Sequence, residues 1–207
     1  MPSQERAHRT RSAIVAAAQI EFSQRGYAAA TARTMAARAG VAIGSFYQYF
    51  RDKDAVLLEI ARERHAAVAH HSLGQLETAP PTAAIGLEEI RARFRAVVAL
   101  VIEFHRRDPG LHAVLTERRH ADPALDALTS EAERSIVERV GELLERWGFQ
   151  GDRLATAFVL FGMVEGSVHA HVLGARVVDD ERFVDALVEA LIQLSRIKET
   201  MPWLTSS

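Results

Sequence analysis

Apolar residues recur every three or four positions through most of the chain, which is the spacing of one face of an α-helix. A long example begins at Ile90, continues to His105 and is stopped by Asp108-Pro109-Gly110. Alternation of apolar and polar residues, which would indicate strands, is not sustained anywhere in the sequence. The pattern therefore predicts an all-α protein.

Proline, glycine and capping residues divide this pattern into segments. We expect helices over residues 10–24, 32–39, 43–50, 53–76, 87–107, 111–119, 123–147, 152–173 and 180–199. Residues 1–9 are expected to form a mobile arm. Residues 78–85, TAPPTAAI, are expected to form a loop because of their two consecutive prolines.

The segment Thr31–Lys53, TARTMAARAGVAIGSFYQYFRDK, contains two short helical stretches separated by a glycine. Thr31 suits an N-cap, and Gly40 can adopt the left-handed conformation that ends a helix at low cost. The apolar Val41 then fits into the angle between the two helices. This arrangement predicts a helix-turn-helix, a motif whose second helix lies in the major groove of DNA.

The second helix of this motif, residues 43–50, divides into two faces. Phe46 and Phe50 lie four residues apart and are expected to point into the core. The opposite face carries hydroxyl, amide and small side chains rather than charged ones. A buried aromatic helix in an ordinary bundle is the alternative, but two tyrosines, a glutamine and a glycine would make a poor core face.

The outer residues suit contacts to duplex DNA. Gln48 can form two hydrogen bonds to adenine, Ile43 can contact a thymine methyl group, and Gly44 permits close approach. Hydroxyl groups suit phosphate oxygens. Arg33 is expected to face DNA, the alternative being a solvated arginine, and a phosphate would favour Lys53 at the positive end of the next helix. The predicted DNA-binding residues are Thr31, Arg33, Ile43, Gly44, Ser45, Tyr47, Gln48, Tyr49 and Lys53.

Several motifs at fixed spacing together resemble the TetR family of bacterial transcriptional regulators. They are Arg25-Gly26-Tyr27, Thr31, Ala39-Gly40-Val41 and Gly44-Ser45-Phe46-Tyr47-Gln48-Tyr49-Phe50-x-x-Lys53, all within residues 10–57. The resemblance implies that the chain beyond residue 60 forms an all-helical ligand-binding and dimerisation domain. It also implies a cavity there, whose ligand shifts the DNA-binding heads and releases DNA.

The sequence departs from the family pattern at two positions. Ala42 stands where the family often has serine, and Thr34 stands where an acid usually completes a capping box. Each change is expected to remove a side-chain cap worth about 0.5–1 kcal/mol.

Charge is distributed unevenly along the 207 residues, whose net charge is −2. Residues 1–55 contain eight Lys/Arg and four Asp/Glu, a net of +4, and the remainder contains seventeen and twenty-three, a net of −6. A basic N-terminal quarter on an acidic body is typical of a DNA-binding head. We therefore expect a DNA-binding domain over residues 1–55 and an effector-binding and dimerisation domain over residues 56–207.

Several classes of protein are not expected. The sequence has no cysteine, which excludes disulfides and thiolate metal sites and fits a reducing cytoplasm. Its N-terminus lacks the apolar segment of a signal peptide, and the longest apolar run, Leu154–Val164, is too short to span a bilayer. A di-iron bundle needs two Glu-x-x-His motifs, and only Glu117–His120 has this form. We expect a cytoplasmic protein with no membrane partner, cofactor or metal.

Small residues follow one another at intervals of four in the helix that begins near Asp152. A glycine costs about 1 kcal/mol in a helix interior, so such a row implies that another backbone approaches closely. We predict a four-helix bundle across a two-fold axis, which would place two DNA-binding heads about 34–36 Å apart. A helix crossing within one chain is the alternative. The predicted interface residues are Gly162, Gly166, Ala170, Gly174, Leu187 and Leu191.

An effector site is expected among the body helices. The nominated residues are Phe94, Val98, Ile102, His105, Phe158, Phe161, Glu165 and His169. The apolar residues among them have the helical spacing that residues of an ordinary core usually have, so a plain core is the favoured alternative. Glu165 and His169 could instead bond across the dimer or pair with each other. An apolar lining with a few polar groups favours a small hydrophobic molecule.

These features predict a transcriptional regulator, a repressor, that binds a palindromic operator in double-stranded DNA as a homodimer and is released by a small hydrophobic effector. The alternatives are an all-α small-molecule-binding module and a helical-bundle enzyme, neither acting on DNA. An enzyme is not expected because the sequence has no glycine-rich phosphate loop, nucleophile elbow or zincin motif.

Overall fold

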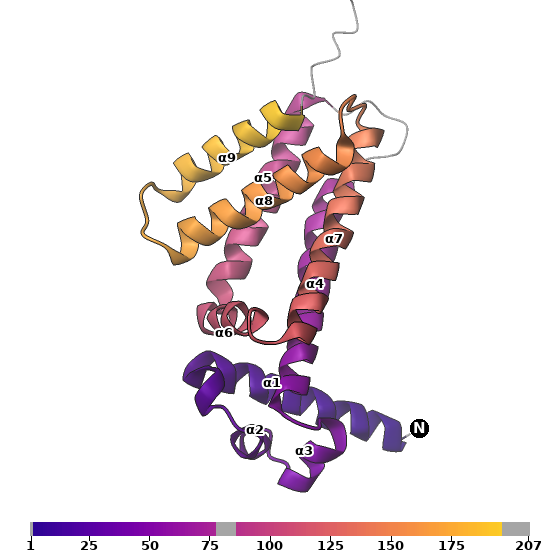
Figure 1. Ribbon diagram of the computed structural model, residues 1–207, viewed down its shortest axis with the longest axis vertical. Coiled ribbons are helices and arrows are strands. Elements are labelled where there is room, and N and C mark those ends of the chain that lie inside the picture. The colour runs from indigo at the N-terminus through magenta and orange to yellow at the C-terminus, as the bar shows by residue number, and fades with distance from the viewer. Residues whose placement is uncertain (1, 78–85, 196–207) are drawn as a thin grey trace, which may run out of the picture. The chain divides into compact units, whose positions relative to one another are not determined.

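The computed structural model describes residues 2–77 and 86–195, which form α-helices joined by short connections (Figure 1). The helices are α1 (Pro2–Ala29), α2 (Ala32–Arg38), α3 (Ile43–Tyr49), α4 (Lys53–Glu77), α5 (Leu87–Arg107), α6 (Pro109–Arg119), α7 (Pro123–Arg146), α8 (Arg153–Leu173) and α9 (Asp180–Ser195). No strand occurs in these two ranges, so the all-α prediction is confirmed. The loop predicted at 78–85 and the end of the last predicted helix, 196–199, lie outside the described residues.

The chain divides into two compact units. The first comprises Met1–Ala67 and Asp108–Glu131, and the second comprises Val68–Arg107 and Ala132–Ser207. The helices α4 and α7 therefore contribute residues to both units. The predicted division into a DNA-binding domain (1–55) and an effector-binding and dimerisation domain (56–207) assigns functions to two parts of the chain, and it remains a prediction.

The first unit is built on α1, which packs against α2 and α6, while α2 packs against α3. Its core includes Ile14, Phe22, Met35 and Phe46, all fully buried. The helix α1 begins at Pro2, so the prediction of a mobile arm over residues 1–9 is wrong from Pro2 onward. No glycine or second proline stops a helix in this stretch.

The helix α6 begins at Pro109, two residues earlier than predicted, because Asp108 caps it. The Asp108 carboxylate accepts hydrogen bonds from the Leu111 amide (2.9 Å) and from the Ser23 hydroxyl of α1 (2.6 Å). A Cβ added to Gly110 would lie only 2.3 Å from the Ser23 carbonyl oxygen. The first turn of α6 therefore rests directly on the backbone of α1, and a side chain at position 110 would not fit.

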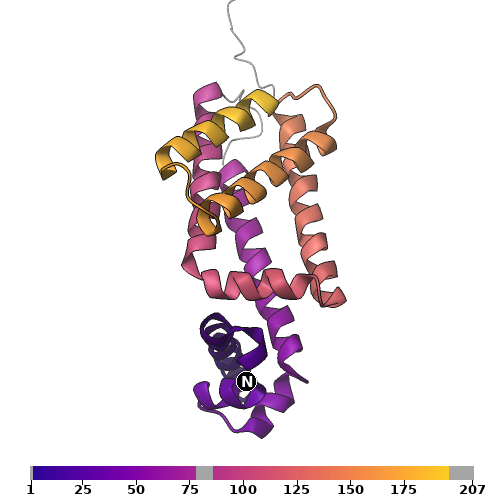
Figure 2. The same cartoon turned by 60° about the vertical axis from the view of Figure 1, so that its left-hand side comes forward.

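The second unit contains α5, α8 and α9, which pack on one another. The orange α8 and the yellow α9 lie side by side in Figure 1, and Figure 2 shows them from another direction. The predicted apolar stripe of α5 is buried in this core: Ile90 and Val98 are fully buried, and Ile102 nearly so. Buried Arg93 ties α5 to the end of α4 by donating to the Leu76 carbonyl oxygen (2.6 Å).

Candidate nucleic-acid interface and effector cavity

The turn between α2 and α3 has the predicted geometry. Gly40 adopts a φ of 68°, and the Val41 amide donates to the Ala36 carbonyl oxygen (3.0 Å), which closes the end of α2. The next helix buries Phe46 and Phe50 in the core of the first unit. The predicted division of α3 into an inner and an outer face is therefore correct.

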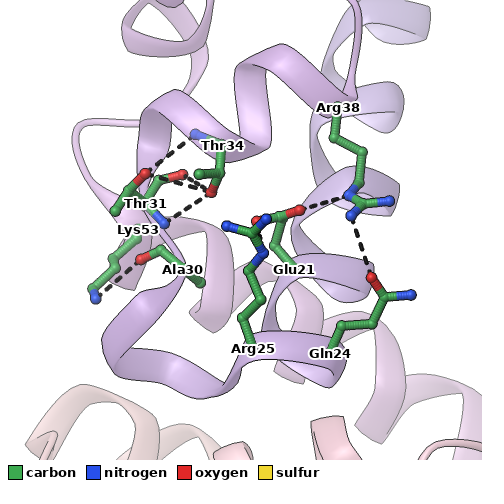
Figure 3. Close-up of polar contacts among 8 residues, drawn as sticks. All are labelled: Glu21, Gln24, Arg25, Ala30, Thr31, Thr34, Arg38 and Lys53. Carbon is green, nitrogen blue, oxygen red and sulfur yellow. Dashed lines mark hydrogen bonds and ion pairs between the residues drawn. The ribbon is translucent and has the colours of Figure 1, made fainter.

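Thr31 and Thr34 form a complete capping box at the start of α2 (Figure 3). The Thr34 amide donates to the Thr31 hydroxyl oxygen (3.2 Å), and the Thr31 amide donates to the Thr34 hydroxyl oxygen (3.1 Å). The expected loss of this cap is wrong, because a threonine hydroxyl accepts the bond that an acid would accept. The other expected loss is confirmed, since Ala42 provides no side-chain cap for α3.

Glu21 links α1 to α2, which the sequence analysis did not predict. Its buried carboxylate accepts a hydrogen bond from Nε of Arg38 (2.7 Å) and lies 3.5 Å from Nε of Arg25, as Figure 3 shows. The Arg38 hydrogen bond is the main reason why the pKa of Glu21 lies below its ordinary value of 4.5, although burial opposes this shift. The available signal was an acid inside the apolar stripe of α1, beside Phe22.

The outer face of α3 is exposed. Ile43 is 43% exposed and Tyr47 is 57% exposed, which is unusual for large apolar and aromatic side chains in a small helix. The other predicted DNA-binding residues of α3 are either exposed, as Gly44 and Gln48 are, or half-buried, as Ser45 and Tyr49 are. This surface offers apolar, amide and hydroxyl groups without charge.

Arg33 is an exposed cation on α2, the helix that precedes this surface. It makes no hydrogen bond or ion pair with any residue that the structure describes, whereas Arg38 on the same helix is bound to Glu21 and Gln24 (Figure 3). The Arg33 guanidinium is therefore free to bind a ligand. Thr31 is exposed as well, but its side chain is engaged in the capping box.

Lys53 lies in the first turn of α4, where Asp52 caps the helix as predicted by accepting from the Ala55 amide (2.8 Å). The Lys53 ammonium group has partners within the protein. Its Nζ donates to the carbonyl oxygens of Tyr27 (2.8 Å) and Ala30 (3.2 Å) at the end of α1 and lies 4.0 Å from the centre of the Tyr27 ring. A phosphate is therefore not needed to explain the position of Lys53, and its assignment as a DNA ligand remains a prediction.

Tyr27 is the centre of this cluster. Its hydroxyl donates to the Asp54 carboxylate, and the guanidinium of Arg118 from α6 lies 4.1 Å from its ring centre. Burial, followed by the Asp54 hydrogen bond, raises the pKa of Tyr27 to about 12. Cations beside an aromatic ring are attracted by its electron-rich face, so Tyr27 connects α1, α4 and α6 within the first unit.

The second unit exposes one face of α8. Phe158 is 67% exposed, and Gly162, Gly166 and Ala170 follow it at intervals of four residues, all of them exposed. A Cβ added to Gly162 or Gly166 would meet no atom of the described residues within 4 Å. No helix crossing within the described chain therefore accounts for these two glycines.

The remaining predicted interface residues have other surroundings. Leu187 and Leu191 are buried in the core of their own unit, so they can support an interface only from beneath it. Gly174 ends α8, and a Cβ there would lie 2.4 Å from the Ala170 carbonyl oxygen. This clash within the end of α8 explains why position 174 is a glycine without any partner chain.

The length and composition of α8, with a mean hydropathy of 1.3, would suffice for a membrane span. It is the one such helix among those described, and a single helix is weak support for a span because core and interface helices meet the same criterion. The apolar run Leu154–Val164, on which the expectation of no membrane span rests, is shorter than the helix itself.

A cavity of about 80 Å³ lies among α4, α5, α7, α8 and α9 inside the second unit. Its lining is mainly apolar and includes three of the nominated residues, Phe94, Phe161 and Glu165. Trp147 packs edge-on against Phe94, with ring centres 6.2 Å apart. The second polar lining residue is Ser72 of α4, which was not nominated.

The other nominated residues do not line this cavity. Val98 and Ile102 belong to the core, and Phe158 is on the exposed face of α8. His105 is buried, with Nδ1 2.9 Å from the Val101 carbonyl oxygen and Nε2 3.9 Å from the Glu165 carboxylate. His169 is exposed on α8, with its ring centre 6.0 Å from that of His105.

A helix-turn-helix with an outward-facing second helix, in one chain with an all-helical unit that encloses an apolar cavity, is the plan of a ligand-responsive transcriptional regulator. The models of two families match the chain: bacterial regulatory proteins of the tetR family over residues 14–60, and the tetracyclin repressor-like C-terminal domain over residues 90–193. The protein belongs to the TetR family, as the motifs of its first sixty residues predicted.

Known proteins resemble the chain over most of its length. The nucleoid occlusion factor SlmA of Photobacterium profundum is 26% identical over 183 residues, covering 83% of this chain and 88% of that protein. A structure described as a TetR-family transcriptional regulator from Mesorhizobium loti has a TM-score of 0.72 at 20% identity, covering 91% of this chain and 98% of the other. SmeT, described as the repressor of a Stenotrophomonas maltophilia multidrug efflux pump, has a TM-score of 0.70 at 21% identity in its triclosan complex, covering 89% and 90%. At these identities the two structural likenesses concern the fold.

Proposed function

We propose that this protein is a cytoplasmic repressor that binds a palindromic DNA operator as a homodimer and is released by a small hydrophobic effector. It acts without enzymatic chemistry, cofactor or metal. The observation that carries the proposal is the exposed outer face of α3, where a tyrosine and an isoleucine are displayed to solvent beside an amide and a glycine.

The groups on this face suit two different roles on DNA, contact with base edges and contact with phosphates. Gln48 is placed to read a base edge through its amide, and Ile43 supports it through contact with a thymine methyl group. The hydroxyls of Ser45, Tyr47 and Tyr49 suit phosphate oxygens, which set the position of the helix without reading sequence. Arg33 adds a cation for either a phosphate or a guanine.

A second copy of this chain is the partner that the exposed face of α8 suits. The row Phe158, Gly162, Gly166 and Ala170 is apolar and closely approachable, and the glycines have no neighbour within their own described chain. Helices that meet through such a row pack at short distance across a two-fold axis. Duplication also gives each operator half-site its own α3, as a palindrome requires.

The effector is assigned to the cavity of the second unit. Its volume of about 80 Å³ is below the roughly 300–1,000 Å³ of typical ligand sites, so an effector has to move the surrounding helices apart. An effector that binds the widened form better shifts the dimer toward that form, which releases DNA if its α3 spacing misfits the grooves. SmeT, which shares the fold, is described in complex with triclosan, a small molecule.

Selection of random duplexes by the full-length protein, followed by sequencing and quantitative gel shift, tests the proposal. A palindrome with half-sites one helical turn apart is expected. The Tyr47→Phe variant should bind all selected operators more weakly, whereas Gln48→Ala should mainly relax the preference at one base position of each half-site, by about 1–3 kcal/mol. Gln150→Ala, an exposed glutamine in the second unit, is the matched control and should leave binding unchanged.

Failure to enrich any palindrome would refute the operator and would favour the alternative, an all-α small-molecule-binding module that does not act on DNA. Equal losses for Gln48→Ala on every sequence would refute the assigned roles of the α3 residues while leaving DNA binding intact.

A further inference from the structure

The effector cavity contains one polar group that the fold leaves without a partner. Ser72 lies on α4, lines the cavity and is only 7% exposed. Its hydroxyl oxygen is buried and makes no hydrogen bond to any protein group among the described residues. A serine in a helix can usually donate to a carbonyl oxygen one turn earlier, so an unbonded hydroxyl here is exceptional.

A second buried serine in the same unit shows the ordinary arrangement. Ser195 at the end of α9 is fully buried, and its hydroxyl donates to the Ile192 carbonyl oxygen at 2.9 Å. An unsatisfied buried hydroxyl costs roughly 1–3 kcal/mol, a cost that a ligand able to hydrogen-bond to it removes. Ser72 is therefore suited to a function inside the cavity, and Ser195 to holding the backbone.

The other polar lining residue is Glu165 of α8, whose carboxylate lies 3.9 Å from Nε2 of His105. The residues of the described chain that line the cavity include no lysine, arginine or histidine. The Glu165 side chain is 37% exposed, and its carboxylate places negative charge beside an otherwise apolar lining, which disfavours an anionic ligand. Uncharged ligands are therefore favoured over acids of the same shape.

We propose that the effector is a neutral, largely apolar molecule with one hydroxyl group, and that Ser72 binds that hydroxyl. This inference rests on the proposed effector-responsive function and specifies its ligand. The aromatic rings of Phe94 and Phe161 in the lining make an alkylphenol a suitable member of the class. Without a partner for Ser72, an alkylbenzene of the same shape binds more weakly.

Three probes that share a propylphenyl framework and differ in the para substituent test this specificity: 4-propylphenol, propylbenzene and 4-propylbenzoate. Trp147 packs against the cavity residue Phe94, so its fluorescence reports binding once Trp203, the only other tryptophan, is changed to phenylalanine. The affinity for 4-propylphenol is expected to exceed that for propylbenzene roughly three- to tenfold, and 4-propylbenzoate should bind most weakly. Isothermal titration calorimetry provides an independent measurement of the same affinities.

Two variants assign these preferences to residues. Ser72→Ala should abolish the preference for 4-propylphenol over propylbenzene while leaving the affinity for propylbenzene unchanged. Glu165→Gln should reduce the difference in affinity between 4-propylbenzoate and 4-propylphenol. Ser195→Ala, which also removes a buried hydroxyl, is the matched control and should keep both preferences. Circular dichroism and thermal unfolding identify any variant that does not fold, and Ser72→Thr, which keeps the hydroxyl, should then retain the phenol preference.

Equal binding of phenol and propylbenzene, a preference that survives Ser72→Ala, or binding of neither probe would overturn the assignment. These results are independent of DNA binding. Selection of a palindrome together with absent hydroxyl preference would contradict only the ligand class. A hydroxyl preference lost in Ser72→Ala, with no palindrome selected, would contradict only the proposed repressor function.

Discussion

The two units of this protein achieve stability in different ways. The first is fastened by polar groups between short helices: the Glu21 carboxylate binds Arg38, the Tyr27 hydroxyl binds Asp54, and Lys53 binds the carbonyl oxygens that end α1. The second also has ion pairs between its helices, such as Arg91–Glu189 and Arg106–Asp180, but these pairs are open to solvent, where such pairs contribute little to stability. Its core is apolar, and it retains a cavity and a large exposed apolar face on α8.

The difference corresponds to the work proposed for each unit. A helix of seven residues, the length of α2 and of α3, is too short to be stable alone. The capping box and the Glu21–Arg38 bond hold α2 in position, whereas α3, which has no side-chain cap, is held by the burial of Phe46. A reading surface for DNA needs such fixed geometry. Apolar packing is less directional, which allows helices around a cavity to shift when a ligand enters. Four substitutions test this contrast, one at the exposed face of α8 and three within the first unit, the latter in decreasing order of expected loss of stability.

Gly162→Leu should disrupt the proposed dimer without unfolding the second unit. Within the described chain a Cβ at position 162 has no neighbour within 4 Å, but a partner helix packed against α8 would be displaced by the leucine. We expect the dissociation constant of the dimer to rise about 30-fold or more, measured by analytical ultracentrifugation. Gln150→Leu adds the same side chain at an exposed site outside α8 and should not change it. Unchanged association in Gly162→Leu would show that α8 is not the interface.

Gly110→Ala should loosen the first unit. A methyl group 2.3 Å from the Ser23 carbonyl oxygen forces α6 away from α1 and breaks the bond between Ser23 and Asp108. The expected loss is about 3 kcal/mol, or roughly 6–12 °C in melting temperature. Gly74→Ala in α4, where a methyl group has open space, should instead stabilise by about 0.5–1 kcal/mol. Equal melting temperatures for the two variants would contradict the tight approach of α6 to α1.

Glu21→Gln should cost about 1–3 kcal/mol at pH 7, less than a fully buried ion pair would, because the Arg38 side chain is 35% exposed. Because the pKa of Glu21 is lowered in the folded state, its stabilising effect is present above the ordinary pKa of 4.5 and is lost as the pH falls through the lower folded value. The difference in unfolding free energy between wild type and variant should therefore shrink on acidification. Chemical denaturation at a series of pH values measures it, with Glu5→Gln at an exposed pair as the control. A difference that stays constant from pH 7 to pH 3 would contradict this role.

Thr34→Ala should destabilise α2 by about 1 kcal/mol through loss of the capping box. Thr34→Gln is the informative comparison, since a glutamine at this position accepts the same hydrogen bond from the Thr31 amide without placing a second carboxylate beside Glu21, and it should retain most of the stability. Hydrogen exchange of the α2 amides, compared with those of α9 in the same sample, measures the local effect. Similar exchange in wild type and Thr34→Ala would exclude a capping function.

The sequence predicted the elements that depend on local signals. Gly40, Asp52 and the spacing of Phe46 and Phe50 each specify a feature within a few residues, and each is found as predicted. The cap formed by Thr34 was missed because the expectation followed the family pattern instead of the chemistry of a hydroxyl group.

Features that depend on distant partners could not be predicted in this way. Periodicity shows that one side of a helix is apolar, but it does not show which neighbour covers that side. The predictions for these faces failed for this reason. Leu187 and Leu191, predicted at the dimer interface, are buried in their own unit, and Phe158, nominated for the effector site, is exposed on α8. Glu21 and Ser72 have polar side chains on buried faces, and their roles depend on helices far away in the sequence.

The exposed apolar face of α8 has a consequence for gene dosage. If operator binding requires two copies joined through this face, then at low copy number the dimer population grows with the square of the amount of protein synthesised. Doubling synthesis in that regime would quadruple operator occupancy, whereas above the dissociation constant the response becomes linear. Low-level transcription of its gene would then yield very little operator-bound dimer, and operator occupancy would rise steeply as the protein concentration approaches the dissociation constant of the dimer.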